Sequence, residues 1–196
     1  IYVTNGIKID ITDWDYKVFI LDSIINSMNR GQSVNLDTWL QSIPSVKTKN
    51  YLYHNNGTLN FDNYTNVWMD EPASFSSGAS YADLDSDGDL DLVVNNVDDI
   101  AFVFKNNTRE EDTGSHYLRF KFLKTPTSTE EVYGATVKLT DAKGQIQMQR
   151  YNPQRGFISS MEHVLHFGTG IQTIIPRVEI TFPLLKKIVL ENVRAD

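Results

Sequence analysis

The sequence contains one dense run of carboxylates, DLDSDGDLDLVV at residues 83–94. Acidic residues stand at every second position around a central Gly88, namely Asp83, Asp85, Asp87, Asp89 and Asp91. Carboxylates crowded in this way repel one another unless a cation lies among them. A hard divalent ion that takes six to eight oxygen ligands suits such a group, which favours calcium over magnesium.

The spacing D-x-D-x-D-G-x-x-D matches the first nine positions of an EF-hand loop. An EF-hand continues with a bidentate glutamate at position 12 and an exiting helix, whereas Val94 occupies that position here. The sequence therefore predicts a calcium loop at residues 83–91 that leads into a buried strand. The expected ligands are the main-chain carbonyl of Asp89 and the side chains of Asp83, Asp85, Asp87 and Asp91. A solvated acidic turn is the alternative interpretation.

Composition limits the classes of protein that the chain can represent. Its 196 residues, 40% of them hydrophobic, are enough for one large or two small domains. Residues 1–116 hold 18 acidic and 7 basic residues, and residues 117–196 hold 7 acidic and 11 basic ones. This asymmetry predicts two regions, of which the acidic one contains the metal loop. The net charge of −7 argues against a nucleic-acid partner.

Several processing and anchoring features can also be judged from the sequence. The chain has no cysteine, so disulfide and thiol chemistry are not expected. It has no run of 18 apolar residues, so no membrane span is expected. It begins with Ile1 rather than methionine and shows no signal-peptide pattern. We therefore expect it to be the C-terminal part of a longer protein.

Two pairs of short apolar segments resemble each other. Residues 1–5 and 51–56 form one pair, and residues 92–96 and 102–107 form the other; each second member reads aromatic, aliphatic, aromatic, polar, Asn, Asn. The alternation is typical of half-buried strands. Repeated antiparallel units of this size predict part of a β-propeller or a similar array.

A helical insertion at about residues 11–47 separates the members of the first pair. Its apolar residues recur at steps of three or four up to Gly31, which predicts a helix. These residues are Trp14, Val18, Leu21, Ile25 and Met28. A second helix is expected over residues 36–43, before Pro44. We expect the two helices to pack on the β-array as a hairpin.

The C-terminal part of the chain has a strand pattern throughout. After a polar linker at residues 109–116, we expect strands at 117–123, 135–139, 145–150, 177–182 and 188–193. Residues 141–144 form the turn between the second and third of these strands. The simplest fold for this part is a small β-sandwich.

Both parts resemble known families. Residues 51–107, with their NNG, Gly78-Ala79 and acidic run, resemble the FG-GAP or VCBS repeat of integrin-α-like β-propellers. Residues 116–196, with RGFISS and LHFG, resemble the ASPIC/UnbV domain of cartilage acidic protein and many bacterial surface proteins. The resemblance implies a partial propeller at 1–112 and an ASPIC/UnbV-like β-domain at 113–196.

The resemblance also implies a cofactor, a location and partners. Calcium is expected in the acidic loop, and the protein is expected outside the cell or on its surface, outer-membrane association included. The remaining N-terminal blades of the same protein are one expected partner. A protein or glycan is the other.

Two further groups of residues could carry chemistry. On a strand, residues three apart such as His163 and His166 would face opposite sides, so these two are not expected to share a metal ion. His166, in the LHFG stretch, is expected to be packed and hydrogen-bonded. The serines at 159 and 160 lack a nucleophile elbow. Two functions remain from the sequence: a non-catalytic, calcium-stabilised module for binding or scaffolding, or an accessory part of a secreted polysaccharide-degrading enzyme.

Overall fold

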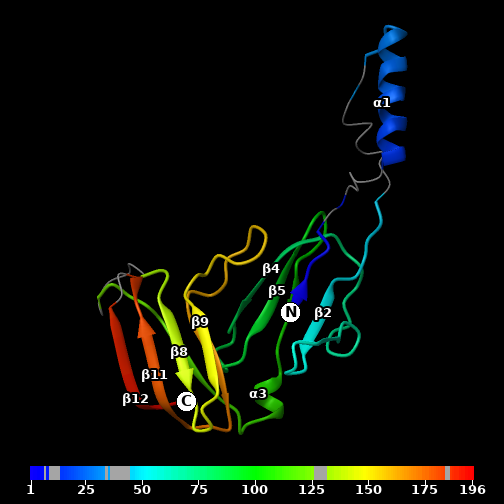
Figure 1. Ribbon diagram of the computed structural model, residues 1–196. Helices are drawn as coiled ribbons and strands as arrows, with labels where there is room; N and C mark the ends of the chain where they lie inside the picture. Colours follow the sequence, from blue (N-terminus) through cyan, green and yellow to red (C-terminus); the bar gives the residue numbers. More distant parts are fainter. Residues whose placement is uncertain (7, 9–13, 34, 36–44, 126–131, 184–185) are drawn as a thin grey trace. The chain divides into compact units, whose positions relative to one another are not determined.

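The computed structural model describes the chain except for residues 7, 9–13, 34, 36–44, 126–131 and 184–185 (Figure 1). The protein is mainly β, with antiparallel strand pairs. It divides into two compact units. Unit 1 comprises residues 1–78 and 94–101, and unit 2 comprises residues 79–93 and 102–196.

The first sheet of unit 1 has the order β1-β2-β3. Its strands are β1 (Tyr2–Val3), β2 (Tyr51–Asn55) and β3 (Phe61–Asn63). Tyr2 pairs with Leu52 in antiparallel register. This pairing confirms the predicted association of residues 1–5 with 51–56.

The second of the two predicted strand pairs is also confirmed. Strands β4 (Ser76–Ala82), β5 (Asp91–Asn96) and β6 (Phe102–Phe104) form a sheet in that order. Val94 in β5 is completely buried, as predicted for a strand that leaves the acidic loop. In the described residues neither three-stranded sheet closes into a barrel, so the propeller remains a prediction.

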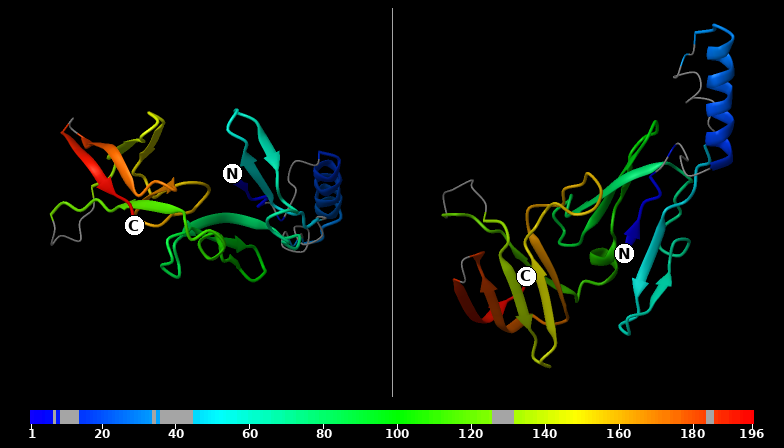
Figure 2. Two further views of the ribbon diagram at one scale, coloured as in Figure 1. Left: turned by 90° about the horizontal axis from the view of Figure 1, so that it is seen from below. Right: turned by 45° about the horizontal axis from the view of Figure 1, so that its top comes forward.

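The inserted helix α1 (Trp14–Asn29) forms where its periodicity predicts (Figure 2). The face that was predicted to be buried is exposed. None of its side chains is buried, and Trp14 is 71% exposed. The partly covered stripe is offset and includes Tyr16, Ile20 and Ile24. The expectation of a packed Trp14 stripe was therefore wrong, because apolar residues surround more of the helix than one stripe. The predicted second helix lies outside the described residues.

A buried polar network joins the segments of unit 1. Asn50 is 1% exposed and Glu71 is 3% exposed. The Tyr2 hydroxyl donates to Glu71 Oε2 at 2.5 Å, and Asn50 Nδ2 donates to the Tyr2 hydroxyl at 2.8 Å, to Glu71 Oε1 and to Ser76 Oγ. Burial and the neighbouring Glu71 carboxylate raise the pKa of Tyr2. The network ties β1 and β4 to the segments at Asn50 and Glu71.

Replacement of Glu71 by alanine should destabilise unit 1 by about 2 kcal/mol, because buried donors of Tyr2 and Asn50 would lose their acceptor. Urea unfolding followed by tryptophan fluorescence measures this loss, because the three tryptophans of the chain belong to unit 1. Asp70→Ala is the matched control, since Asp70 is fully exposed. Equal unfolding midpoints for the two variants would contradict the assigned role of the network.

Unit 2 contains the C-terminal β-structure. Strands β7 (His116–Phe120) and β10 (Leu165–Gly170) pair with each other. A four-stranded sheet has the order β12-β11-β8-β9. Its members are β8 (Thr136–Thr140), β9 (Ile146–Arg150), β11 (Ile174–Thr181) and β12 (Lys187–Arg194). These strands confirm the predicted ones, and β10 is additional.

The core of unit 2 lies between these two sheets. Leu118 and Phe167 from the pair β7-β10 are buried in one cluster with Val137 and Val178 of the larger sheet. At the edge of the larger sheet, the side-chain amides of two β9 residues bond to the backbone of β10. Gln147 Nε2 donates to the Gly168 carbonyl at 2.9 Å, and Gln149 Nε2 donates to the His166 carbonyl at 2.7 Å.

The compact units do not coincide with the two regions expected from the sequence. The acidic loop belongs to unit 2 together with the C-terminal strands. A compact unit is defined by packing and a family domain by sequence, so the boundary between residues 112 and 113 remains a prediction. The segment after β6 contains the short helix α3 (Thr108–Glu111), within and just before the expected linker.

Candidate functional site

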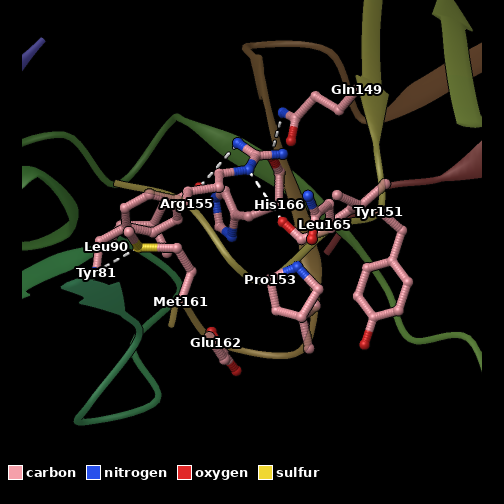
Figure 3. A pocket seen from close by; sticks show the side chains of 12 residues that line it. Tyr81, Leu90, Gln149, Tyr151, Pro153, Arg155, Met161, Glu162, Leu165 and His166 are labelled. Carbon is pink, nitrogen blue, oxygen red and sulfur yellow. Dashed lines mark hydrogen bonds between the residues drawn. The ribbon is translucent and has the colours of Figure 1, made fainter. Parts of the chain in front are cut away.

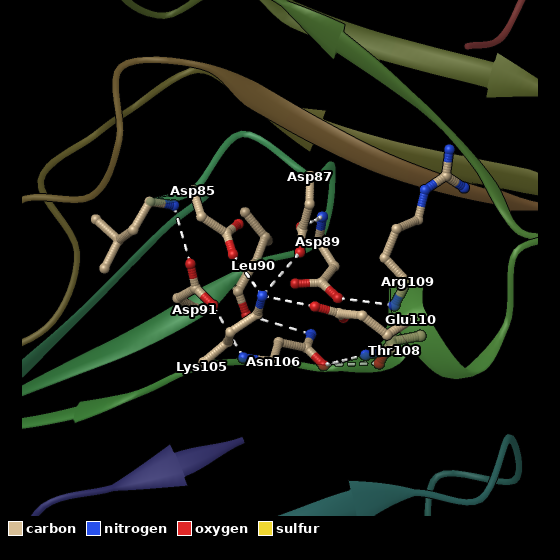
Figure 4. Close-up of polar contacts among 11 residues, drawn as sticks. Asp85, Asp87, Asp89, Leu90, Asp91, Lys105, Asn106, Thr108, Arg109 and Glu110 are labelled. Carbon is tan, nitrogen blue, oxygen red and sulfur yellow. Dashed lines mark hydrogen bonds and ion pairs between the residues drawn. The ribbon is translucent and has the colours of Figure 1, made fainter.

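The acidic loop connects β4 to β5, and its side chains gather in two overlapping groups (Figure 4). One carboxylate oxygen from each of Asp83, Asp85 and Asp87 lies within 4.8 Å of the others. Asp87 and Asp89 form a similar group with Glu110 of α3. The alternating spacing in the sequence thus brings the first three predicted ligands together, and the fold adds a sixth acidic residue.

Three carboxylate oxygens of the loop are buried without a hydrogen-bond partner. They are Asp83 Oδ1, Asp87 Oδ2 and Asp89 Oδ1, and in the described part of the chain only two other buried side-chain polar atoms lack a partner. Burial raises the pKa of Asp89. Buried carboxylates without compensation are costly, and a cation supplies that compensation. These oxygens fit the hard oxygen donors that calcium requires.

Asp91 has a different position from the other four predicted ligands. It is 3% exposed, and both of its carboxylate oxygens accept backbone hydrogen bonds. Leu84 N donates to Oδ2 and Asn106 N donates to Oδ1, each at 2.9 Å. Asp91 therefore closes the loop and attaches it to the segment after β6. Asp89 is also attached, because Arg109 N donates to its Oδ2 at 2.9 Å.

Lys105 brings an ammonium group into the acidic cluster. Its Nζ lies 2.7 Å from Asp85 Oδ2, 3.7 Å from Asp87 Oδ2 and 2.5 Å from Glu110 Oε1. A hydrogen bond from Lys105 lowers the pKa of Asp85, and a second hydrogen bond from Lys105 lowers the pKa of Glu110. Figure 4 shows the ammonium between these carboxylates.

The first residue of the loop is tied to the C-terminal strands of unit 2. The side chain of Asp83 is completely buried, and its Oδ2 accepts a hydrogen bond from Arg119 of β7 at 2.9 Å. The same guanidinium pairs with Glu162. Glu162 Oε2 in turn accepts a hydrogen bond from Asp83 N at 3.4 Å. Arg119 therefore holds one oxygen of Asp83, whereas Oδ1 is buried without a hydrogen-bond partner.

Gly88 allows close packing at the turn of the loop. Its φ is +101°, and a Cβ built there would lie 2.1 Å from Cε1 of Tyr117. Tyr117 and Arg119 are two residues apart in β7, so they lie on the same face of that strand. The loop consequently rests against the outer face of β7, opposite the buried Leu118.

Gly88→Ala should destabilise unit 2 by about 2 kcal/mol, because the new methyl group meets both an unfavourable φ and the Tyr117 ring. Gly144→Ala is the matched control: its φ is +78° and no atom lies within 4 Å of the built Cβ. Urea midpoints from circular dichroism give the difference. If Gly144→Ala is equally harmful, the contact with Tyr117 has no energetic weight.

Lys105, Glu110 and Arg119 were not predicted from the sequence. Glu110 follows Asp83 by 27 positions and lies in the segment that was treated as a linker. The one available signal was the acidic pair Glu110-Glu111 soon after an Asn-Asn turn. Nothing in the spacing of Arg119 connects it with the loop, because its contact depends on how β7 is placed.

The histidines and serines considered above do not form a catalytic group. The ring of His166 stacks on Tyr117 at 5.2 Å between centroids, and burial lowers its pKa. His163 instead has an edge contact with Tyr133. Packing of His166 is confirmed, but its Nδ1 lacks the expected hydrogen bond. The hydroxyl of Ser159 donates to the carbonyl of Phe157.

A small cavity of about 160 Å³ lies beside β10 (Figure 3). Arg155 spans one side of it and donates to the Tyr81 hydroxyl at 3.1 Å. Glu162 is the one carboxylate among the described residues that line the cavity, and it is paired with Arg119. The cavity is smaller than typical ligand pockets of about 300–1,000 Å³. It offers no pair of free carboxylates.

Models of two known families match different parts of the chain. A model described as FG-GAP-like repeat matches residues 36–94, which include the acidic loop. A model described as ASPIC and UnbV matches residues 125–196. A search of curated proteins gave no match to the chain. In the described part of the chain, no helix has the length and apolar character needed to cross a membrane.

Proposed function

Because the chain carries an FG-GAP-like repeat followed by an ASPIC/UnbV domain, we propose that it is a calcium-binding, non-catalytic module of the cell exterior. FG-GAP repeats are typically extracellular, and both domains are generally non-catalytic. In this proposal the module is secreted or surface-bound. It binds a protein or glycan partner or acts as a scaffold.

The observation that carries the calcium assignment is the set of buried loop oxygens without hydrogen-bond partners. Asp83, Asp85 and Asp87 would hold the ion, and Asp89 would complete the site. Bound calcium would supply positive charge to carboxylates that are otherwise short of donors. Asp91 would act differently, since its two hydrogen bonds keep the loop closed.

The proposed role of calcium is structural. Arg119 links Asp83 to β7, and Tyr117 packs against Gly88. An ion that fixes the loop would therefore also stabilise the contact of the loop with β7. Carboxylates committed to a cation are poor general acids, because the cation favours their ionised form.

An accessory role in polysaccharide degradation is the second candidate from the sequence. Glycoside hydrolysis commonly requires two carboxyl groups on opposite sides of the scissile bond. The cavity beside β10 contains one carboxylate, which is already ion-paired. The cavity beside β10 therefore does not supply the pair of carboxyl groups that this chemistry requires.

Two measurements test the proposal. Titration calorimetry with calcium chloride should give binding to one site, and the Asp85→Asn/Asp87→Asn variant should lose it. Incubation with plant, algal and host glycans should give binding without new reducing ends or unsaturated products. Absence of calcium binding would refute the metal assignment, and turnover would refute the non-catalytic one.

A further inference from the structure

We propose that Lys105 is a built-in competitor of calcium for Asp85 and Asp87, and that it lowers the calcium affinity of the loop. This inference rests on the calcium-binding function proposed above. The contacts of Nζ with Asp85 Oδ2 at 2.7 Å and Asp87 Oδ2 at 3.7 Å place the ammonium on two of the predicted ligands. The D-x-D-x-D-G-x-x-D spacing does not predict that a basic side chain from outside the loop lies beside Asp85 and Asp87.

The competition follows from charge and from shared oxygens. A divalent ion held by Asp85 and Asp87 would lie close to the ammonium, and two cations at such a distance repel each other. Lys105 is part of the chain, so its local concentration does not fall when the solution is diluted. Calcium must therefore displace the ammonium from Asp85 in order to bind.

Glu110 gives the displaced ammonium a second position. Its Oε1 lies 2.5 Å from Nζ, on helix α3 rather than on the loop. The side chain of Lys105 is 49% exposed, and ion pairs at such exposure are individually weak. The ammonium can thus leave Asp85 while it retains Glu110. Lys105 weakens calcium binding without preventing it, and it neutralises part of the cluster when calcium is absent.

Lys105→Met tests the proposal by titration calorimetry of the full chain with calcium chloride. We expect the variant to bind calcium about tenfold more tightly than the wild type, because the competing charge is gone. Lys143→Met removes the same charge from the exposed turn between β8 and β9. This control should change the affinity less than twofold.

Thermal melting of the same proteins provides a second readout. In chelator, Lys105→Met should melt below the wild type, since the carboxylates of the cluster repel one another without the ammonium. In saturating calcium the order should reverse or the difference should vanish. A general loss of packing would instead lower the melting temperature equally in both conditions.

The outcomes separate this inference from the proposed function. Tighter calcium binding by Lys105→Met than by the wild type supports the inference. If Lys105→Met binds calcium and the wild type does not, the inference is still supported, but the proposed calcium function of the natural chain fails. Unchanged or weaker binding, with a wild type that binds, overturns the inference and leaves the function in place. If neither protein binds calcium, both are overturned.

Discussion

Arg119→Met is expected to destabilise the calcium-free protein by about 3 kcal/mol, because it leaves the buried carboxylate of Asp83 without its cation. The Asp83 side chain has no exposed surface, and Arg119 is 29% exposed. The same substitution removes the ion-pair partner of Glu162. Urea unfolding followed by circular dichroism measures the loss, and hydrogen exchange of β7 and β10 locates it.

Calcium should reduce the effect of this substitution. An ion at Asp83 neutralises the carboxylate that Arg119 otherwise compensates, so the loss in saturating calcium should be clearly smaller than in chelator. Arg194→Met, on the exposed end of β12, is the matched control and should cost less than about 0.5 kcal/mol. An equal loss for Arg119→Met with and without calcium would mean that the ion and Arg119 act on separate groups.

Removal of calcium from the wild type is expected to lower the stability of unit 2 by about 2.7 kcal/mol if the ion was present at 100 times its dissociation constant, and by about 4.1 kcal/mol at 1,000 times. The physical reason is that calcium binds the folded loop and has no comparable site in the unfolded chain. Melting with calcium and with chelator measures the difference. For a domain of this size the midpoint should shift by about 10 °C.

The tryptophans help to locate the effect. Trp14, Trp39 and Trp68 all precede the loop, and unit 2 contains no tryptophan. Tryptophan fluorescence therefore reports on residues outside unit 2, whereas hydrogen exchange of β7 reports inside it. Asp85→Asn should reproduce the effect of chelator, and Asp22→Asn on helix α1 is the matched control. A midpoint in chelator equal to that in calcium would contradict a structural role for the ion.

Much of the β-structure could be predicted because it depends on local patterns. Alternation of apolar and polar residues placed β7, β8 and β9, and the turn at residues 141–144 joined two of them. Strand β10 was missed as a strand because its LHFGTG sequence contains two glycines, which weaken the pattern. Periodicity also identified α1, but it could not indicate which side of the helix is covered.

In the candidate site, too, only the residues whose closeness depends on local spacing could be predicted. Aspartates at alternate positions in one short loop must lie near one another, so Asp83, Asp85 and Asp87 could be found from spacing alone. Glu110 lies on α3, Arg119 lies on β7, and Lys105 lies in the segment between β6 and α3. Their approach to the loop depends on tertiary packing, and one sequence without that packing contains no measure of it.

The glutamine bonds between β9 and β10 have a mechanical consequence for unit 2. Backbone ladders hold most neighbouring strands in register, whereas this join uses Gln147 and Gln149 side chains. Rotation of these two side chains would remove the hydrogen bonds but not the apolar packing, because the buried cluster around Leu118, Phe167, Val137 and Val178 also holds the two sheets together. Gln149 and His166 also line the small cavity, so the Gln149 amide fixes one wall of that cavity to β10.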